Sequence, residues 1–393
     1  MKAWKVGGAV RDALLGRPGS DIDWVVTGAT PEAMRAAGYL PVGRDFPVFL
    51  HPVTRQEYAL ARTERKTAPG YHGFVFHADP GVTLEEDLQR RDLTINAMAQ
   101  DETGRIIDPY GGQHDLQARL LRHVSPAFAE DPVRILRVAR FAARFVDFQV
   151  APETQVLMQR MVSVGEVDAL VAERVWQELS RGLMEVQPTR MFDVLHDSGA
   201  LARLMPELQA AWSSATPEAT RWRCAIDLAA RQALPLPARF AVVTTRLGGI
   251  DHTTRADALA SLCERWRIPT DCREVAELVL REHDVVCSGT AMDAEQRVQL
   301  LDRCDAWRRP ERFEVMLQAC ECIARADGSG SARGHAVSFM RWRQSRSRGA
   351  AVDTGAAARR AAERGARGPQ IAAAVHDARV RAVAEDLNDE IND

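Results

Sequence analysis

Two carboxylates placed two residues apart are the first feature of this chain that could do chemistry. Asp21 and Asp23 flank Ile22, and apolar residues follow to Val26. Because side chains two residues apart in a strand point to the same face, we expect the two carboxylates side by side. Adjacent like charges are unfavourable unless a cation neutralises them, and paired oxygen ligands suit Mg²⁺. Strand or turn carboxylates without a metal are the other interpretation of this pair.

A glycine pair lies just upstream of these carboxylates. Gly7 and Gly8 follow the β-like run Trp4–Val6 and precede Arg11, in a segment typical of a helix start. A strand that ends at two glycines before a helix turns backbone N–H groups toward a phosphate, and Arg11 could reach the same anion. A simple strand–turn–helix connection is the alternative. The short spacing to Asp21 favours one nucleotide-handling site.

Residues 85–99 combine acidic and basic side chains. Read as a helix, this segment places Asp87 four residues before Arg91 and puts Ile95 on the same face. One interpretation is an arginine that is oriented by carboxylates and aimed at a triphosphate. A salt-bridged surface helix is the other.

Residues 131–145 have apolar side chains at helical spacing with arginines between them. Read as one helix, they place Asp131 and Arg134 on one face, and Arg137 and Arg140 extend that line. A carboxylate accepts from an exocyclic amine and a guanidinium donates to a ring nitrogen, so such a pair could read cytosine and adenine without a template. Uracil and guanine show the reverse pattern. A solvated basic stripe is the alternative.

The elements that must position these residues change character near residue 125. Before it, short β-like runs alternate with turns, and after it helical periodicity continues to residue 393, with helices expected over 131–145 and 175–186. We therefore predict an α+β fold with a small mixed domain followed by helices. The expected strands are Trp4–Val6, Ile22–Val26, Glu57–Ala61 and Arg105–Ile107.

Composition bounds the class of protein. The chain has 393 residues, of which 46% are hydrophobic and 27% charged, which excludes a mainly disordered chain and predicts two or three domains. No apolar run approaches the roughly 18 residues of a membrane span, and the N-terminal segment does not resemble a signal peptide, so a cytoplasmic protein is expected. The net charge of −3 shows no basic excess, although a local basic face remains possible. The seven cysteines lack zinc spacing, and we expect them to be buried.

In order and spacing, these motifs resemble the class II CCA-adding enzymes, the bacterial tRNA nucleotidyltransferases. The resemblance is strong over residues 1–210 and weaker over the helical remainder. The segments that carry it are 7–12, 19–26, 42–52, 57–66, 85–99, 106–112, 120–145 and 173–195.

The resemblance implies an architecture and an activity. It implies a polymerase-β-like head at 1–125, a helical neck for nucleobase recognition at 126–205, a helical body at 206–325 and a tRNA-contacting tail at 326–393. The implied reaction is sequential addition of C, C and A to the 3′ end of tRNA, from CTP and ATP, with release of pyrophosphate. The oligomeric state, monomer or dimer, stays open.

The resemblance also implies roles for single residues. Asp21 and Asp23 would hold Mg²⁺, and Glu57 is the candidate third carboxylate. Asp131 and Arg134 would read the base, and residues 64–81 match a hinged loop. The residues expected to hold the nucleotide, largely through its phosphates and ribose, are Gly8, Arg11, Arg91, Arg137 and Arg140.

One segment departs from the relatives that carry an HD phosphohydrolase domain. Thr245 and Arg246 stand where those relatives have a His-Asp pair, while His283 and Asp284 form a pair further on. We therefore expect an incomplete HD region without hydrolase activity, and a structural or surface role for His283.

Two further functions stay open as alternatives. A poly(A) polymerase of the same superfamily would share the head, but the segment 43–52 favours the CCA-adding branch. An inactive RNA-binding relative is disfavoured by the intact Asp21 and Asp23 and the intact segments around Arg91 and Arg134.

Overall fold

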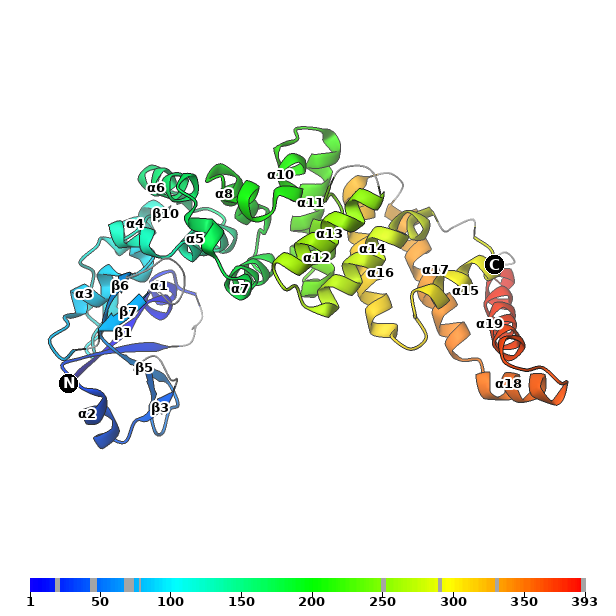
Figure 1. The fold of residues 1–393 in the computed structure, drawn as a ribbon, viewed down its shortest axis with the longest axis horizontal. Helices are drawn as coiled ribbons and strands as arrows, with labels where there is room; N and C mark the ends of the chain where they lie inside the picture. Colours follow the sequence, from blue (N-terminus) through cyan, green and yellow to red (C-terminus); the bar gives the residue numbers. More distant parts are fainter. Residues whose placement is uncertain are drawn as a thin grey trace. The chain divides into compact units, whose positions relative to one another are not determined.

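The computed structural model describes residues 1–17, 22–42, 48–66, 74–77, 79–248, 252–288, 292–328 and 332–389. The chain forms two compact units, Met1–Pro206 and Glu207–Asp393 (Figure 1). The candidate ligand Asp21 lies outside the described residues, as do 67–73 and 78 of the expected hinged loop. The four-part division expected from the sequence stays a prediction.

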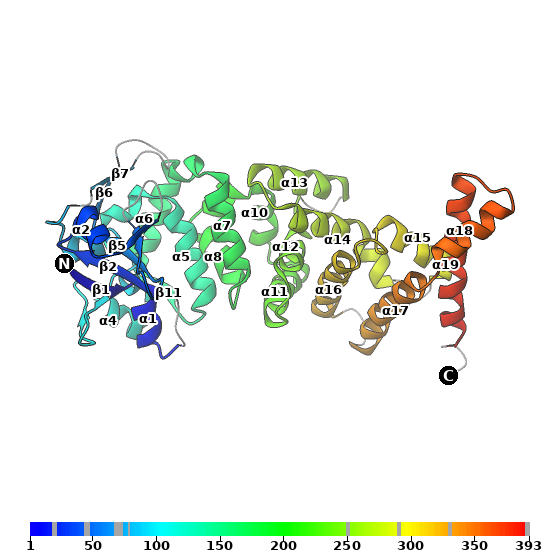
Figure 2. The same cartoon turned by 90° about the horizontal axis from the view of Figure 1, so that it is seen from below.

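The first unit begins with a mixed β-sheet (Figure 2). In the described residues its strand order is β3-β4-β5-β2-β1-β8-β9, with β1 antiparallel to β2 and β2 parallel to β5. All four expected strands are present. The strands are β1 (Lys2–Val6), β2 (Asp23–Thr27), β3 (Leu40–Val42), β4 (Val48–Leu50), β5 (Glu57–Leu60), β8 (Ala99–Gln100) and β9 (Ile106–Ile107); β6 (Thr63–Lys66) pairs separately with β7 (Phe74–His77).

Alternation along the strands buries both faces of this sheet. Val6 and Val25 pack with Leu88 in one apolar cluster, whereas Val26 packs with Met34 in another. Side chains two residues apart share a face, so short runs with apolar residues at alternating positions can form strands that are buried on both faces.

Helices surround the sheet and continue into the rest of the first unit. Helix α5 packs against α7 and α8, and its Ile135 and Val138 are fully buried. Each such side chain contributes about 1.5–3 kcal/mol of burial free energy, which anchors α5. The helices are α1 (Gly8–Leu14), α2 (Pro31–Ala36), α3 (Leu84–Gln89), α4 (Gly112–Ala118), α5 (Val133–Arg144), α6 (Pro152–Ser163), α7 (Ala172–Leu183), α8 (Thr189–Asp197) and α9 (Ala200–Leu204).

The expectation of helices alone after residue 125 is wrong at one place. Strand β11 (Gln149–Val150) pairs in parallel with β10 (Leu120–Leu121), so the segment after α5 lies beside the segment before it. A two-residue strand is too short to leave a periodic signal in the sequence.

The described part of the second unit is helical. Helices α11, α12, α14 and α16 pack on one another (Figure 2). None of the described helices has the length and apolar character needed to cross a membrane. The helices are α10 (Pro206–Ser213), α11 (Pro217–Arg231), α12 (Leu236–Thr244), α13 (His252–Arg265), α14 (Thr270–Ser288), α15 (Ala294–Arg303), α16 (Pro310–Asp327), α17 (Ala332–Ala350), α18 (Thr354–Glu363) and α19 (Pro369–Asp389).

The segment aligned with the HD region forms ordinary helical contacts. Thr245 donates to the carbonyl of Val242 at 2.8 Å, and His283 lies 3.0 Å from the Asp284 carboxylate. Among the described residues, no group of three or more His, Cys, Asp or Glu side chains could hold a metal. The lack of hydrolase activity stays a prediction. Cys224 is exposed, against the expectation that the cysteines are buried.

Candidate active site

A cleft of about 700 Å³ in the first unit collects most of the predicted site residues. Gly8, Asp23 and Asp131 line it, and Phe141 forms an apolar part of its wall. The other lining side chains within the described residues are largely basic. The arginines that line it are Arg11, Arg90, Arg91, Arg134, Arg137, Arg140, Arg144, Arg174 and Arg181.

Asp23 and Glu57 begin neighbouring parallel strands. They are direct partners in the β2–β5 register, so both side chains leave the same face of the sheet. Two adjacent carboxylates are the oxygen ligands that a hard divalent cation prefers, and this donor set fits such an ion. Asp23 also lines the cleft.

The turn between β1 and α1 approaches Arg91 closely. Gly7 has φ +67°, and a Cβ added there would lie 2.9 Å from Nη1 of Arg91. Only glycine meets both the backbone conformation and this close approach. Helix α1 then begins at Gly8, which confirms the expected strand–turn–helix order.

Arg11 lies at the cleft but is buried and already oriented. Its Nε donates to Asp12 at 2.8 Å, and its Nη1 donates to the side-chain oxygen of Asn96. Its guanidinium also lies over the rings of Phe141 and Phe145. Burial lowers the pKa of Arg11 against the opposing effect of Asp12.

The segment around Arg91 corrects the sequence reading. Helix α3 ends at Gln89 instead of running on toward Ile95, because Leu93 is extended and forms a β-bridge with His123. The predicted contact survives without the helix. The fully buried Asp87 bonds Arg91 at 3.2 Å and also bonds Arg90 at 2.7 Å.

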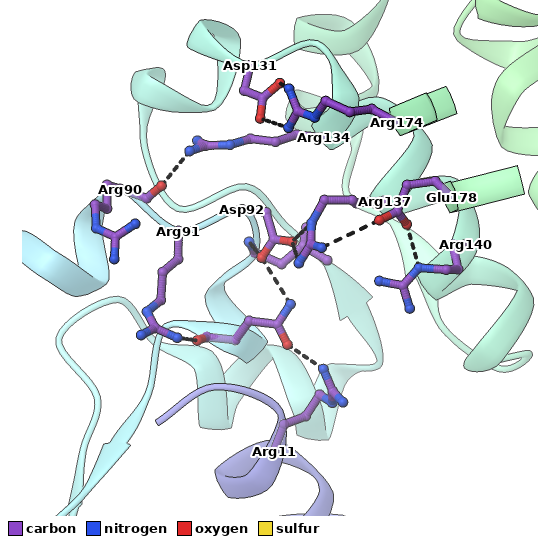
Figure 3. A network of polar contacts seen from close by, with 12 residues as sticks. Arg11, Arg90, Arg91, Asp92, Asp131, Arg134, Arg137, Arg140, Arg174 and Glu178 are labelled. Carbon is purple, nitrogen blue, oxygen red and sulfur yellow. Dashed lines mark hydrogen bonds and ion pairs between the residues drawn. The ribbon is translucent and has the colours of Figure 1, made fainter. Parts of the chain in front are cut away.

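Asp92 is the centre of a buried polar network (Figure 3). Its carboxylate accepts from Arg137 Nε at 2.7 Å, from Asn96 Nδ2 at 3.0 Å and from the backbone N–H of Leu93 at 2.8 Å. Burial raises the pKa of Asp92, but the charge of Arg137 and these hydrogen bonds outweigh it and hold the pKa far below its usual range. In Asp87 burial is likewise outweighed, by Arg90 and Arg91, so its pKa is also lowered.

These lowered pKa values predict how the stability of the first unit depends on pH. Because both carboxyl groups have a lower pKa folded than unfolded, their contribution is full above the ordinary Asp pKa of about 4 and is lost as pH falls below it. We expect the free energy of unfolding, from urea titrations, to begin to fall below about pH 5 and to keep falling below about pH 3, toward the lowered folded-state pKa values. Asp92→Asn should flatten this dependence; a variant with the wild-type slope would contradict the assignment.

The predicted base-reading pair also needs a correction. Asp131 is extended and precedes α5, which begins at Val133, so Asp131 and Arg134 do not share a helix face. Asp131 accepts from Arg174 Nη2 at 2.7 Å, while Arg134 donates to the carbonyl of Arg90 at 2.6 Å (Figure 3). Both side chains nevertheless line the cleft.

Helix α7 supplies the partners that sequence reasoning missed. Arg174 binds Asp131, and Glu178, which is 5% exposed, accepts from Arg140 Nε at 2.6 Å. Arg137 lies 3.7 Å from the same carboxylate (Figure 3). One signal in the sequence could have found them. Arg174 and Glu178 lie four residues apart, and so on one face of a helix, inside a segment that carries the family resemblance. Helix α7 thus holds two arginines of α5, Arg137 and Arg140, in place through Glu178.

Comparisons with known proteins agree with this geometry. The family described as "Poly A polymerase head domain" matches residues 3–122, and the one described as "Probable RNA and SrmB- binding site of polymerase A" matches residues 147–211. The "Multifunctional CCA protein" of Leptothrix cholodnii is 56% identical, over 98% of this chain and 97% of that protein. The protein of the same name from Variovorax paradoxus is 53% identical, over 98% and 99%.

Solved structures lead to the same family. The crystal structure of the Bacillus stearothermophilus CCA-adding enzyme in complex with CTP matches with a TM-score of 0.69 at 25% identity, over 98% of this chain and 88% of that one. The Thermotoga maritima CCA-adding enzyme complexed with tRNA shares the fold, with a TM-score of 0.59 at 24% identity, over 86% and 77%. Relatives that match along nearly their whole length share more than half of their residues with this chain, and the head-domain family matches its first part. This chain therefore belongs to the family of multifunctional CCA proteins, the CCA-adding tRNA nucleotidyltransferases.

Proposed function

We propose that this chain adds C, C and A in turn to the 3′ end of tRNA, using CTP and ATP and releasing pyrophosphate. The observation that carries the proposal is that one arginine-lined cleft contains Asp23 at one part of its wall and Asp131 with Arg134 at another. A nucleoside triphosphate needs both ends of such a site, because its phosphates must be neutralised while its base edge is read. The relatives' names and the nucleotide complexes of the solved neighbours support the same activity.

The chemistry proposed for the phosphate end follows from charge. The 3′ hydroxyl of tRNA attacks the α-phosphorus in line, a new P–O bond forms, and the bond to the bridging oxygen breaks as pyrophosphate leaves. Arg11 and Arg91 would orient and neutralise the phosphates. We propose that Asp21, Asp23 and Glu57 hold Mg²⁺, which when bound would supply charge stabilisation at the transferred group.

The base end is proposed to work by hydrogen-bond matching. A carboxylate offers about four acceptor positions, so Asp131 can receive an exocyclic amine while it keeps Arg174. Arg134 would donate to the ring nitrogen. Arg137 and Arg140, held by Asp92 and Glu178, would contact the nucleotide beside it.

Arg134→Ala should therefore reduce base selectivity more than triphosphate binding. We expect the ratio of kcat/KM for CTP over UTP to fall about 10–100-fold, since a two-bond base contact discriminates by roughly 1–3 kcal/mol. Inhibition by tripolyphosphate should stay the same. Arg160→Ala, a change on α6 away from the cleft, is the control. An unchanged preference for C and A in Arg134→Ala would refute the base-reading role.

Incubation with single nucleotides tests the proposed function. With tRNA that ends at the discriminator base, CTP alone should add two residues and ATP alone none. With tRNA that ends in CC, ATP alone should add one. Long runs of A would instead identify a poly(A) polymerase, and tRNA binding without any addition would identify an inactive RNA-binding protein.

The tail is proposed to contact tRNA. The stretch Arg341–Arg348 is rich in arginine, but Arg343 within it is paired with Glu314 at 2.8 Å. A second group of arginines lies between α18 and α19, in a cleft of about 740 Å³ that Glu363 and Asp377 also line. Its arginines are Arg360, Arg364 and Arg381.

We propose that this activity takes place in the cytoplasm.

A further inference from the structure

One buried carboxylate connects two helices that carry different parts of the nucleotide site. Asp12 on α1 is 1% exposed, and its Oδ1 accepts from Arg11 Nε at 2.8 Å. Its Oδ2 accepts from Arg144 Nη2, also at 2.8 Å. Arg144 is the last residue of α5, so this contact joins segments 132 residues apart in the sequence.

The same junction includes the ring contacts of Arg11. Its guanidinium carbon lies 5.2 Å from the ring centre of Phe141 and 5.1 Å from that of Phe145, and both rings belong to α5 or its end. Glu185, whose pKa is raised by burial, lies 3.7 Å from Arg140, and Arg17 lies over the ring of Phe145, so both also belong to this junction. The end of α5 is therefore fixed to α1 by packing and by charge.

These two helices present the two ends of the site. Helix α1 follows the Gly7–Gly8 turn and carries Arg11, on the phosphate side. Helix α5 carries Arg134, on the base side. Because a nucleotide has a fixed length between its phosphates and its base, both ends bind together only when α1 and α5 keep one relative placement.

We propose that Asp12 and Arg144 are positioning residues that hold the phosphate end and the base end of the nucleotide site at the spacing of a nucleoside triphosphate. This inference rests on the proposed nucleotide addition. Neither residue needs to touch the reacting atoms, since the contact of Asp12 with Arg144 acts through the placement of α5.

The charge of Asp12 gives a test in which two explanations predict opposite signs. If the residue mattered only through its charge, Asp12→Asn would remove a negative group from beside the phosphate site and tighten binding of CTP. If the residue sets the spacing, the same substitution weakens binding of CTP, because the ion pair to Arg144 is lost. Tripolyphosphate, which occupies the phosphate end alone, should bind as in the wild type.

The experiment measures dissociation constants of CTP, ATP and tripolyphosphate by calorimetry, together with KM and kcat for nucleotide addition. For Asp12→Asn and Arg144→Gln we expect about tenfold weaker CTP and ATP binding, or about 1.4 kcal/mol, with a larger change in KM than in kcat. The double variant should lose no more than either single one. Arg144→Lys should recover part of the loss, and Arg160→Gln should behave as wild type.

Several outcomes would overturn the inference. They are tighter or unchanged CTP binding in Asp12→Asn, an equal loss for tripolyphosphate and CTP in Arg144→Gln, or additive losses in the double variant. A lower kcat at constant KM, together with a lower Tm, would indicate a merely structural role. If Asp12→Asn does not fold, the dissociation constants of CTP for Arg144→Gln and Arg144→Lys test the inference instead. Equal losses in these two variants would then overturn it. A wild type that binds CTP but adds no nucleotide would refute the proposed function alone, because the binding constants test the spacing independently.

Discussion

Asp23→Asn should lower the rate of nucleotide addition about a thousandfold or more, which corresponds to a rise of at least about 4 kcal/mol in the activation free energy. Asp23 begins β2 at the wall of the cleft, beside Glu57 on β5. Replacing a carboxylate by an amide removes a negative ligand while it keeps the shape of the side chain. The rate of single-turnover addition to tRNA, measured at saturating CTP, is the quantity to compare.

The controls for this variant separate chemistry from folding. Binding of tRNA and the urea unfolding midpoint should match the wild type, since Asp23 lies at a strand end. Glu57→Gln should also lose activity, whereas Glu102→Gln, an exposed head carboxylate away from the cleft, should not. Wild-type rates in Asp23→Asn would exclude this carboxylate from the catalytic site.

Asp92→Ala should cost the first unit about 3–5 kcal/mol of unfolding free energy. Asp92 is 6% exposed and accepts hydrogen bonds from Arg137, Asn96 and the backbone of Leu93. Truncation leaves an arginine charge and further donors without their acceptor. Nucleotide addition should fall as well, because the amide of Asn96 also holds Arg11.

A surface ion pair of the same type is the matched control for Asp92→Ala. Arg203 binds Asp168 where both side chains are about half exposed. Exposed pairs contribute roughly 0–1 kcal/mol, so Asp168→Ala should change the unfolding free energy little. A loss below about 1 kcal/mol in Asp92→Ala would show that the buried network does not stabilise the fold.

The parts of the fold that depend on local pattern could be predicted from the sequence. Short β-like runs predicted the strands around Val6 and Val25, and the glycine pair predicted the start of α1. Apolar residues at helical spacing gave α5 and α7 to within a few residues. Each of these signals lies within a short segment, where side-chain periodicity or a backbone requirement fixes the structure.

The parts that depend on distant pairs could not be predicted in this way. The helix expected through Ile95 ends early because Leu93 pairs with His123, a contact that local propensity does not contain. Asp131 precedes α5, and its partner Arg174 lies 43 residues further on. The resemblance pointed to the correct segments, but the partners of each charge came only from the structure.

Sequencing the 3′ ends of the products tests the central claim most directly. A tRNA that ends at its discriminator base is incubated with the chain, Mg²⁺ and all four nucleoside triphosphates at equal concentration. We expect a single product that ends in CCA and is not extended further. Ends that contain U or G, runs of A, or an unchanged tRNA would contradict it.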